Sequence, residues 1–202
     1  MIGAVVLASG NPGKLKELQE LFRRQFRLIS MSELNLDPVE ETGTTFEENA
    51  LIKARAAAAQ CGRPALSDDS GLEVDALNGA PGVFSARYAG RNADSSANIR
   101  KLLAELGGVA PPHRSARFRC VLALVPPDGE DAPLIAHGVW EGSIAQSPRG
   151  GGGFGYDPVF LDRDSGKCAA LMSRDEKGCV SHRGAAARKL RALVEAGRNA
   201  AG

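Results

Sequence analysis

Two adjacent aspartates are the residues that say most about the chemistry of this 202-residue chain. Asp68 and Asp69 follow a short apolar run, residues 64–66, and precede Gly71, at which the backbone can turn sharply. Adjacent carboxylates repel each other, so a folded chain rarely places them beside an apolar strand without a cation to neutralise them. The pair therefore indicates either a divalent metal site or, more simply, two polar residues that cap a loop.

A glycine-containing loop near the N-terminus is typical of a phosphate site. Residues 9–13 (SGNPG) follow an apolar run and precede Lys14, where a helix is predicted to begin. A strand, a glycine turn and a helix together present backbone N–H groups to a phosphate, and the lysine adds a positive charge. The loop is not a Walker A motif, because Ala8 and Leu15 stand where that motif has glycine and a hydroxyl residue. A turn that merely ends a strand remains the alternative.

More carboxylates lie between this loop and the aspartate pair. Glu47 and Glu48 open a predicted helix, where they would face the positive end of its dipole, and Lys53 follows on the same helix. Glu40 and Glu41 have no such role, since they lie in a predicted loop. Mg²⁺ usually takes one or two carboxylates together with phosphate oxygens and water. These acids therefore favour a magnesium site, although helix capping explains part of the set.

Two segments of the C-terminal half have the composition of a base-binding site. Residues 150–157 (GGGGFGYD) combine glycines with Phe154 and Tyr156, whose rings offer faces on which a planar base can stack. Lys177 and residues 181–184 (SHRG) supply positive charge near the predicted start of the last helix. A flexible surface loop and ordinary surface charges are the alternatives. Taken together, the clusters are what a nucleoside triphosphate with Mg²⁺ requires.

The elements that must position these residues are predicted from hydrophobic periodicity. The pattern predicts strands over residues 2–8, 27–30, 116–125 and 134–141, with the third half-buried and a hairpin turn at residues 126–129. It predicts helices from Lys14, with Glu17 facing outward, over residues 45–61 and 95–106, and from Ser181. Strands and helices mix without a strict βαβ rhythm. We therefore expect an α/β protein of mixed α+β character, in two lobes rather than two independent domains.

Composition excludes several classes of protein. Lys and Arg number 25 against 24 Asp and Glu, so the chain is not a polybasic protein held to nucleic acid by long-range charge. No apolar run approaches the roughly 20 residues that span a bilayer, and the N-terminus lacks the basic region of a signal peptide. The four cysteines are far apart and the three histidines are scattered, which predicts reduced thiols in a cytoplasm and no zinc site.

Five segments of the chain, in order, resemble the inosine triphosphate pyrophosphatase family, also called the HAM1 family. They are SGNPGK, EETGTTFEENALIKA, DDSGLEVDALNGAPGVFSARYAG, GGFGYDPVF and SHRG, and they extend over residues 9–184, about nine tenths of the chain. One such segment is weak evidence, whereas five in the same order are specific. The resemblance implies hydrolysis of ITP, dITP and XTP to the nucleoside monophosphate and pyrophosphate, which cleanses the nucleotide pool.

The resemblance also implies a fold and partners. It implies a single domain over residues 1–202, in the form of an elongated two-lobed subunit with a central mixed β-sheet flanked by helices. It further implies Mg²⁺ as the cofactor and a homodimer. A cytoplasmic enzyme of this kind acts on small nucleotides and has no nucleic acid polymer or membrane as a partner.

Motif by motif, the resemblance implies site residues. Asp69 is the implied proton acceptor and a metal ligand, and the other implied metal ligands are Glu40 and Glu41, with Glu48 as a further candidate. Asp68, as a second proton acceptor, and Lys53, as a counter-charge for the phosphates, are chemically suited to complete the catalytic set. The implied substrate-binding residues are Ser9, Gly10, Asn11, Pro12, Gly13, Lys14, Ser70, Phe154, Gly155, Tyr156, Asp157, Lys177, His182 and Arg183.

Selection of the base is expected to depend on the oxygen at C6 of hypoxanthine and xanthine, where adenine carries an amino group. A pocket that points donors at this oxygen leaves a polar mismatch with adenine. His182, Arg183 and backbone N–H groups are the candidate donors, Phe154 can stack on the ring, and Asp157 can orient it.

Three other functions compete with this interpretation. A related pyrophosphatase of the Maf type would prefer modified pyrimidine or 7-methylguanine nucleotides, but the long match over residues 40–90 and the SHR segment disfavour it. A regulatory module would bind nucleotide without hydrolysis, but it has less use for carboxylates beside polyanionic phosphates. An interaction protein with no chemistry would leave the four clusters unexplained.

Overall fold

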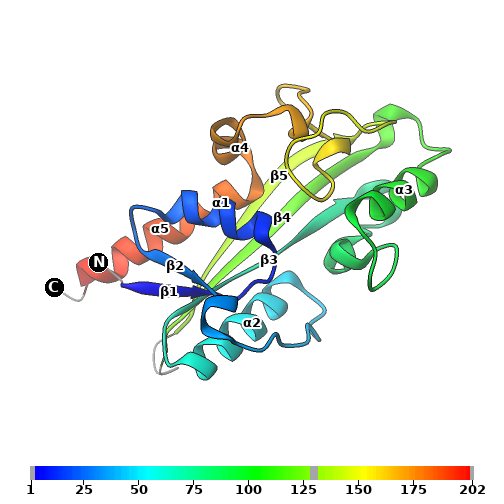
Figure 1. The fold of residues 1–202 in the computed structure, drawn as a ribbon. Helices are drawn as coiled ribbons and strands as arrows, with labels where there is room; N and C mark the ends of the chain where they lie inside the picture. Colours follow the sequence, from blue (N-terminus) through cyan, green and yellow to red (C-terminus); the bar gives the residue numbers. More distant parts are fainter. Residues whose placement is uncertain (1–2, 128–131, 201–202) are drawn as a thin grey trace. The chain divides into compact units, whose positions relative to one another are not determined.

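The structure is a computed structural model that describes residues 3–127 and 132–200. Its strands are β1 (Ala4–Leu7), β2 (Arg27–Ser30), β3 (Ala65–Val74), β4 (Ser115–Val125), β5 (Leu134–Ile144) and β6 (Phe160–Asp162). Over the described residues they form a sheet in the order β2-β1-β3-β4-β5-β6 (Figure 1). β1 pairs in parallel with β2 and β3, whereas β5 and β6 are antiparallel. The predicted α/β fold with a mixed sheet is therefore confirmed.

The α-helices begin and end close to their predicted limits. They are α1 (Pro12–Phe22), α2 (Phe46–Cys61), α3 (Ser95–Glu105), α4 (Arg174–Val180) and α5 (His182–Ala200). α1 begins before the predicted Lys14 because the side chain of Asn11 caps it, accepting hydrogen bonds from the N–H groups of Gly13 and Lys14. α2 begins with the predicted capping box between Thr45 and Glu48. Neither α4 nor the short strand β6 was predicted from the sequence.

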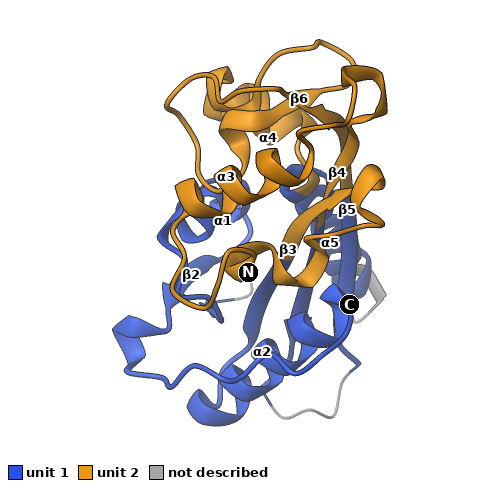
Figure 2. Cartoon of the chain, turned by 90° about the vertical axis from the view of Figure 1, so that its right-hand side faces the viewer, with its two compact units in different colours: residues 1–69, 120–138, 183–202 blue, residues 70–119, 139–182 orange. Residues whose placement is uncertain are grey.

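The chain divides into two compact units, each made of separate stretches of sequence (Figure 2). Unit 1 comprises residues 1–69, 120–138 and 183–202, and unit 2 comprises residues 70–119 and 139–182. β3, β4 and β5 each contribute residues to both units. That the two units form a single domain stays a prediction.

The core of unit 1 joins α1 and α5 to the sheet. Leu18 and Phe22 of α1 and Leu190 of α5 pack with Leu66 of β3 and Leu122 of β4, and all five are almost fully buried. Figure 1 shows α1 and α5 on one face of the sheet and α2 on the other. Because helices cover both faces here, the part of β4 that lies in unit 1 is buried on both sides. The prediction of a half-buried strand is wrong for this part and holds only near Ser115–Arg119 of β4.

The core of unit 2 is aromatic. The ring of Phe118 lies 4.6 Å from that of Phe160 and 4.7 Å from the stacked imidazole of His182. Trp140 packs against Phe160 at 4.8 Å, and its indole N–H donates a hydrogen bond to Asp162 at 2.8 Å. Ring pairs at these separations contribute beyond the area that they bury, so β4, β5 and β6 are held firmly together in this unit.

The path of β3 corrects one prediction about the aspartate pair. Gly71 was expected to turn the chain sharply after Asp69, but β3 continues through Asp69 and Gly71 and ends at Val74. The sharp turn is wrong, and the aspartates lie within a strand rather than at its end. Of the turn predicted at residues 126–129, Asp128 and Gly129 lie outside the described residues. Among the helices of residues 3–127 and 132–200, none has the length and apolarity needed to cross a bilayer.

Arg114 is a buried cation that unit 2 binds through backbone carbonyls. Its guanidinium donates to the carbonyl oxygens of Leu106 at 2.6 Å, Val109 at 2.9 Å and Ala145 at 3.3 Å. These acceptors lie at the end of α3, in the loop after it, and directly after β5. The residue is only 4% exposed. Arg114 therefore ties α3 to β5.

Replacing Arg114 by methionine is expected to lower the free energy of unfolding by about 2 kcal/mol, because buried carbonyls lose a charged donor. Urea denaturation followed by circular dichroism measures the change. Arg100→Met is the matched control, since Arg100 lies exposed on α3 and should change stability by less than about 0.5 kcal/mol. Equal effects of the two substitutions would contradict the structural role of Arg114.

Candidate active site

The predicted phosphate loop lies between β1 and α1 in unit 1. The hydroxyl of Ser9 accepts a hydrogen bond from the N–H of Asn11 at 3.2 Å, and Asn11 in turn caps α1. The ammonium group of Lys14 lies 2.7 Å from a carboxylate oxygen of Asp68 and 3.3 Å from its carbonyl oxygen. The structure thus brings the loop and the first aspartate together. Three of the predicted phosphate-binding residues are exposed to solvent: Gly10, Asn11 and Pro12.

Asp68 is fully buried and lies among positive charges. One carboxylate oxygen accepts from Lys14 at 2.7 Å, and the other accepts from Nε of Arg183 at 2.6 Å. Burial alone would raise the pKa of Asp68, but the charges of Arg183 and Lys14 hold this pKa well below 3.8. The Cys120 thiol lies 3.5 Å away, and burial together with the Asp68 charge raises the pKa of this thiol. Asp68 is therefore an ionised anchor for two cations.

Arg183 also binds Glu17, a residue that was predicted to face outward. Its Nη1 lies 2.5 Å from a carboxylate oxygen of Glu17, which is 24% exposed. Burial would lower the pKa of Arg183, but Asp68 and Glu17 outweigh it and raise that pKa. The outward orientation predicted for Glu17 is wrong, because the guanidinium of a distant helix draws its side chain inward. The sequence did contain one indication of this orientation: Glu17 lies three residues after Lys14, and residues with this spacing share a face of a helix.

Asp69 faces the opposite side of β3 and meets a different cation. Adjacent residues of a strand point to opposite faces, so Asp69 lies toward α2, where Lys53 contacts it at 2.6 Å. The same ammonium lies 2.8 Å from Glu41 and 3.0 Å from the carbonyl oxygen of Asp68. Burial raises the pKa of Asp69 above 3.8, against the lowering effect of Lys53. Burial would lower the pKa of Lys53, but Asp69 and Glu41 raise it.

The remaining predicted acids are arranged differently. Glu40 is exposed. Glu48 accepts hydrogen bonds from the N–H groups of Thr44 at 2.7 Å and Thr45 at 3.1 Å, which lower its pKa, so this carboxylate serves the start of α2. Glu41, by contrast, shares the ammonium group of Lys53 with Asp69.

Two carboxylates directed at one cation fit Mg²⁺ when substrate supplies the other ligands. Glu41 and Asp69 approach the same ammonium group, so their oxygens are arranged around a positive charge. No group of three or more His, Cys, Asp or Glu side chains able to hold a metal exists among the described residues. Mg²⁺ commonly uses one or two carboxylates plus phosphate oxygens and water, which is compatible with this pair.

The predicted base-binding segment lies in unit 2. Asp157, which is 2% exposed, accepts from the N–H of Phe154 at 2.8 Å and from Lys177 at 2.6 Å. The Lys177 ammonium lies 5.1 Å from the centroid of the Phe154 ring, which is partly exposed. Gly155 follows with a positive φ of 61°. These residues form a compact group in which a buried ion pair lies beside a partly exposed ring.

Tyr156 lies in the core rather than on this surface. It is 5% exposed, packs in the aromatic core of unit 2, and its hydroxyl donates to the carbonyl oxygen of Ser85 at 2.9 Å. The suggestion that both aromatic rings offer stacking faces is therefore corrected, since of the two residues only Phe154 is partly exposed. Burial raises the pKa of Tyr156, so its hydroxyl stays protonated.

The last two segments of the predicted site are also placed. His182 is 4% exposed and stacks on Phe118, and Arg183 binds Asp68 and Glu17 in unit 1. Ser70 is partly buried in β3. Within unit 1 the structure thus brings together Lys14, Asp68 and Arg183, and also Glu41, Lys53 and Asp69. Within unit 2 it brings together Phe154, Asp157 and Lys177.

Comparison with known proteins decides the family. The model of the Ham1 family matches residues 5–193. This chain belongs to the Ham1 family. The predicted family is confirmed, and the matched range contains every candidate site residue.

Relatives in the Ham1 family are similar along almost their whole length. A dITP/XTP pyrophosphatase from Coxiella burnetii is 51% identical over 191 residues, which are 94% of this chain and 96% of that protein. One from Shigella flexneri is 49% identical over 196 residues, 96% of this chain and 98% of that protein. The solved structure of a HAM1 protein from Coxiella burnetii superposes with a TM-score of 0.87 at 50% identity, covering 96% of this chain and 99% of that one.

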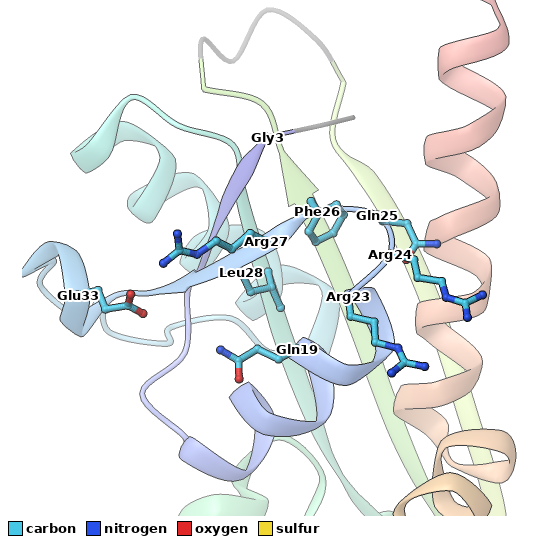
Figure 3. A pocket seen from close by; sticks show the side chains of 9 residues that line it. All are labelled: Gly3, Gln19, Arg23, Arg24, Gln25, Phe26, Arg27, Leu28 and Glu33. Atoms are coloured by element: carbon cyan, nitrogen blue, oxygen red, sulfur yellow. The ribbon is translucent and has the colours of Figure 1, made fainter.

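A surface hollow elsewhere in this Ham1 protein is lined by none of the candidate site residues. It lies at the end of α1 and the start of β2 (Figure 3). The guanidinium groups of Arg23 and Arg24 point away from that of Arg27, so the three charges do not converge on one ligand. The hollow therefore offers no evidence for a second anion site.

Proposed function

We propose that this Ham1 protein hydrolyses non-standard purine nucleoside triphosphates, ITP, dITP and XTP, to the monophosphate and pyrophosphate. The naming of the relatives as dITP/XTP pyrophosphatases supports this activity. The observation that carries the proposal is that the two adjacent aspartates bind different positively charged side chains. Asp68 anchors Lys14 and Arg183 on one face of β3, while Asp69 meets Lys53 and Glu41 on the other.

The phosphate side of the reaction falls to unit 1. The exposed loop before α1 and the ammonium group of Lys14 are proposed to bind the triphosphate, since a helix N-terminus favours negative charge. The N–H groups of Asn11, Gly13 and Lys14 donate to side chains of the loop, so they would have to exchange these acceptors for phosphate oxygens. Lys14 and Lys53 offset the charge that develops as the bond between the α- and β-phosphates breaks. Both ammonium groups contact the Asp68 carbonyl oxygen, at 3.3 Å and 3.0 Å, which brings them to a common point of β3.

Asp69 is the proposed proton acceptor. A water oxygen forms a bond to the α-phosphorus, the bond from that phosphorus to the bridging oxygen breaks, and pyrophosphate leaves. The proton of the water is proposed to pass to Asp69, whose carboxylate contacts Lys53 at 2.6 Å. Asp68 is less suited to this role, because its carboxylate is fully buried and committed to Lys14 and Arg183.

Glu41 and Asp69 are the proposed ligands of Mg²⁺, and exposed Glu40 is a further candidate. When bound there, the ion would neutralise phosphate charge and polarise the oxygen that leaves. The two carboxylates would hold the ion beside Lys53, which they already contact, and the positive charges of the ion and of Lys53 would attract the phosphates. Activity is accordingly expected to be lost with EDTA and restored by added MgCl₂.

Residues of unit 2 are proposed to bind the base. Phe154 offers a face for stacking, and the ammonium of Lys177 and nearby backbone N–H groups donate to the C6 oxygen of the base. Asp157 orients both of them. His182 is proposed to support this surface through the aromatic core, and Ser70 and Gly155 to contact the nucleotide. Arg183 contributes through Asp68 in the conformation described.

We also propose that the enzyme is a cytoplasmic homodimer that acts on free nucleotides rather than nucleic acid polymers. All four cysteines are free thiols, as is usual in a reducing compartment. The nearly balanced charge gives no long-range attraction to nucleic acid. Sedimentation equilibrium tests the dimer, and a monomer at micromolar concentration would refute it.

The products of the purified protein with ITP test the proposed function. IMP and pyrophosphate are expected in equal amounts, measured by anion-exchange chromatography and by phosphate release before and after added inorganic pyrophosphatase. IDP with orthophosphate would indicate a phosphatase instead. Binding of ITP without either product would indicate a regulatory module, and both outcomes would overturn the proposal.

A further inference from the structure

The glycine loop before Phe154 packs against the protein itself. A Cβ atom at Gly150 would lie 2.7 Å from a methyl carbon of Leu171, and one at Gly152 would lie 2.7 Å from the carbonyl oxygen of Ala170. Both neighbours belong to the short 3₁₀ helix η6 (Ala169–Leu171). At Gly152 the obstacle is backbone, so glycine is needed there, whereas at Gly150 the obstacle is the exposed Leu171 side chain and the positive φ of 74° favours glycine. The glycines therefore do more than allow a ligand to approach.

Gly153 has the closest contact of the loop. A Cβ atom at this residue would lie 2.0 Å from Oδ2, 2.8 Å from Cγ and 3.0 Å from Cβ of Asp157. Its φ of +72° is also in the left-handed region that glycine favours. Any other residue at position 153 must consequently displace the carboxylate of Asp157.

The atom that would be displaced is the one that organises the base-binding group. Oδ2 of Asp157 accepts from the N–H of Phe154 at 2.8 Å and from Nζ of Lys177 at 2.6 Å. Both charged side chains are buried, with exposures of 2% for Asp157 and 7% for Lys177. The ammonium held in this way lies over the Phe154 ring, 5.1 Å from its centroid. One oxygen atom therefore positions both the backbone that carries the Phe154 ring and the ammonium group of Lys177.

We propose that Gly153 is a positioning residue for recognition of the purine base, acting through Asp157 on Phe154 and Lys177. This inference rests on the proposed function, because it assigns the base to these side chains. It predicts that a methyl group at residue 153 weakens binding of the base and leaves binding of the phosphates intact, since the phosphate-binding side chains belong to unit 1.

Two ligands separate these effects. Gly153→Ala is expected to raise the Kd of IMP, measured by calorimetry, by about 10-fold, the equivalent of 1.4 kcal/mol for a lost contact. Inhibition by inorganic tripolyphosphate, which has no base, should stay within about twofold of the wild-type value. With ITP as substrate, KM should rise while kcat changes little, because binding of the base is lost equally from the ground and transition states. An unchanged Kd for IMP, or equal weakening of both ligands, would overturn the inference.

Gly166→Ala is the matched control. Gly166 has a positive φ of 66°, and a Cβ atom there would meet no other atom within 4 Å, so alanine adds similar backbone strain without a clash. It lies in the turn after β6, which holds no proposed site residue. Its affinities for IMP and tripolyphosphate should equal those of the wild type. A loss of IMP binding in this variant would mean that strain alone explains the effect at Gly153.

Stability measurements test the same coupling without any nucleotide. Gly153→Ala should lower the Tm by more in the wild-type background than in an Asp157→Ala background, where the carboxylate that clashes is absent. If Gly153→Ala alone fails to fold, the Asp157→Ala variant is compared with the double variant, and their Tm values should differ by little. Equal losses in both backgrounds would refute an action through Asp157. Failure of the wild type to release pyrophosphate would instead refute the proposed function and leave this coupling standing.

Discussion

Replacing ITP by ATP as the substrate is expected to lower kcat/KM by about 10⁴-fold, the discrimination that sites built on polar complementarity reach. The C6 oxygen of hypoxanthine only accepts hydrogen bonds, whereas the amino group of adenine donates them. The ammonium of Lys177 can only donate, and it is fixed by Asp157 at 2.6 Å and by the ring of Phe154. Adenine would therefore bring a donor against a buried donor, which costs the desolvation of both groups.

Steady-state kinetics with ITP, XTP, ATP and GTP at a fixed Mg²⁺ concentration measure this preference. Lys177→Met should reduce the ratio of kcat/KM between ITP and ATP, because the donor that rejects adenine is gone. Lys167→Met is its control, since Lys167 pairs with Glu176 at the surface of the same unit and is outside the proposed site. Comparable kcat/KM values for ITP and ATP in the wild type would refute recognition of the C6 oxygen.

Replacing Asp69 by asparagine is expected to lower kcat for ITP by about 100-fold or more, the lower range of what a general base contributes. Asparagine keeps the size of the side chain but can neither take a proton from water nor give Lys53 a negative partner. The protein should stay folded, because the amide oxygen can still accept from Lys53, which also keeps Glu41 at 2.8 Å. The expected loss thus concerns the reaction more than the fold.

Asp75→Asn is the matched control for this substitution. Asp75 directly follows β3 and binds Arg117 at 2.9 Å, so it is an aspartate in an ion pair, as Asp69 is, but in unit 2 and 45% exposed. It should leave kcat within about twofold, because exposed ion pairs contribute little. Near-normal turnover of ITP by a purified, folded Asp69→Asn variant would remove Asp69 from the mechanism.

The structure places the two adjacent aspartates in different surroundings, which the sequence alone did not show. Either residue was a candidate proton acceptor while only their adjacency was known. Alternation along β3 sends Asp68 toward α1 and α5, where two cations and a thiol enclose it, and Asp69 toward α2. A carboxylate that anchors two cations in the interior is costly to protonate, whereas one beside a single ammonium is available to a substrate.

The sequence by itself determined most helices and strands and the family of this protein, because these follow from patterns within a few neighbouring residues. Hydrophobic periodicity and capping residues predicted α2, α3, β4 and β5 closely, because these signals act within one helical turn or one strand. The motifs predicted the family, because five segments in a fixed order are specific where one alone is weak evidence, and the family is confirmed.

Only the tertiary structure decided which residues of those motifs contact one another and which of them are buried. Glu17 turns inward because Arg183 approaches from a helix that is distant in sequence, and Tyr156 enters the core because Ser85 supplies an acceptor there. The glycine at residue 153 is required by Asp157, whose position depends on Lys177 of α4. Each of these outcomes is an interaction between residues of separate segments, and its energy depends on burial that no local pattern contains.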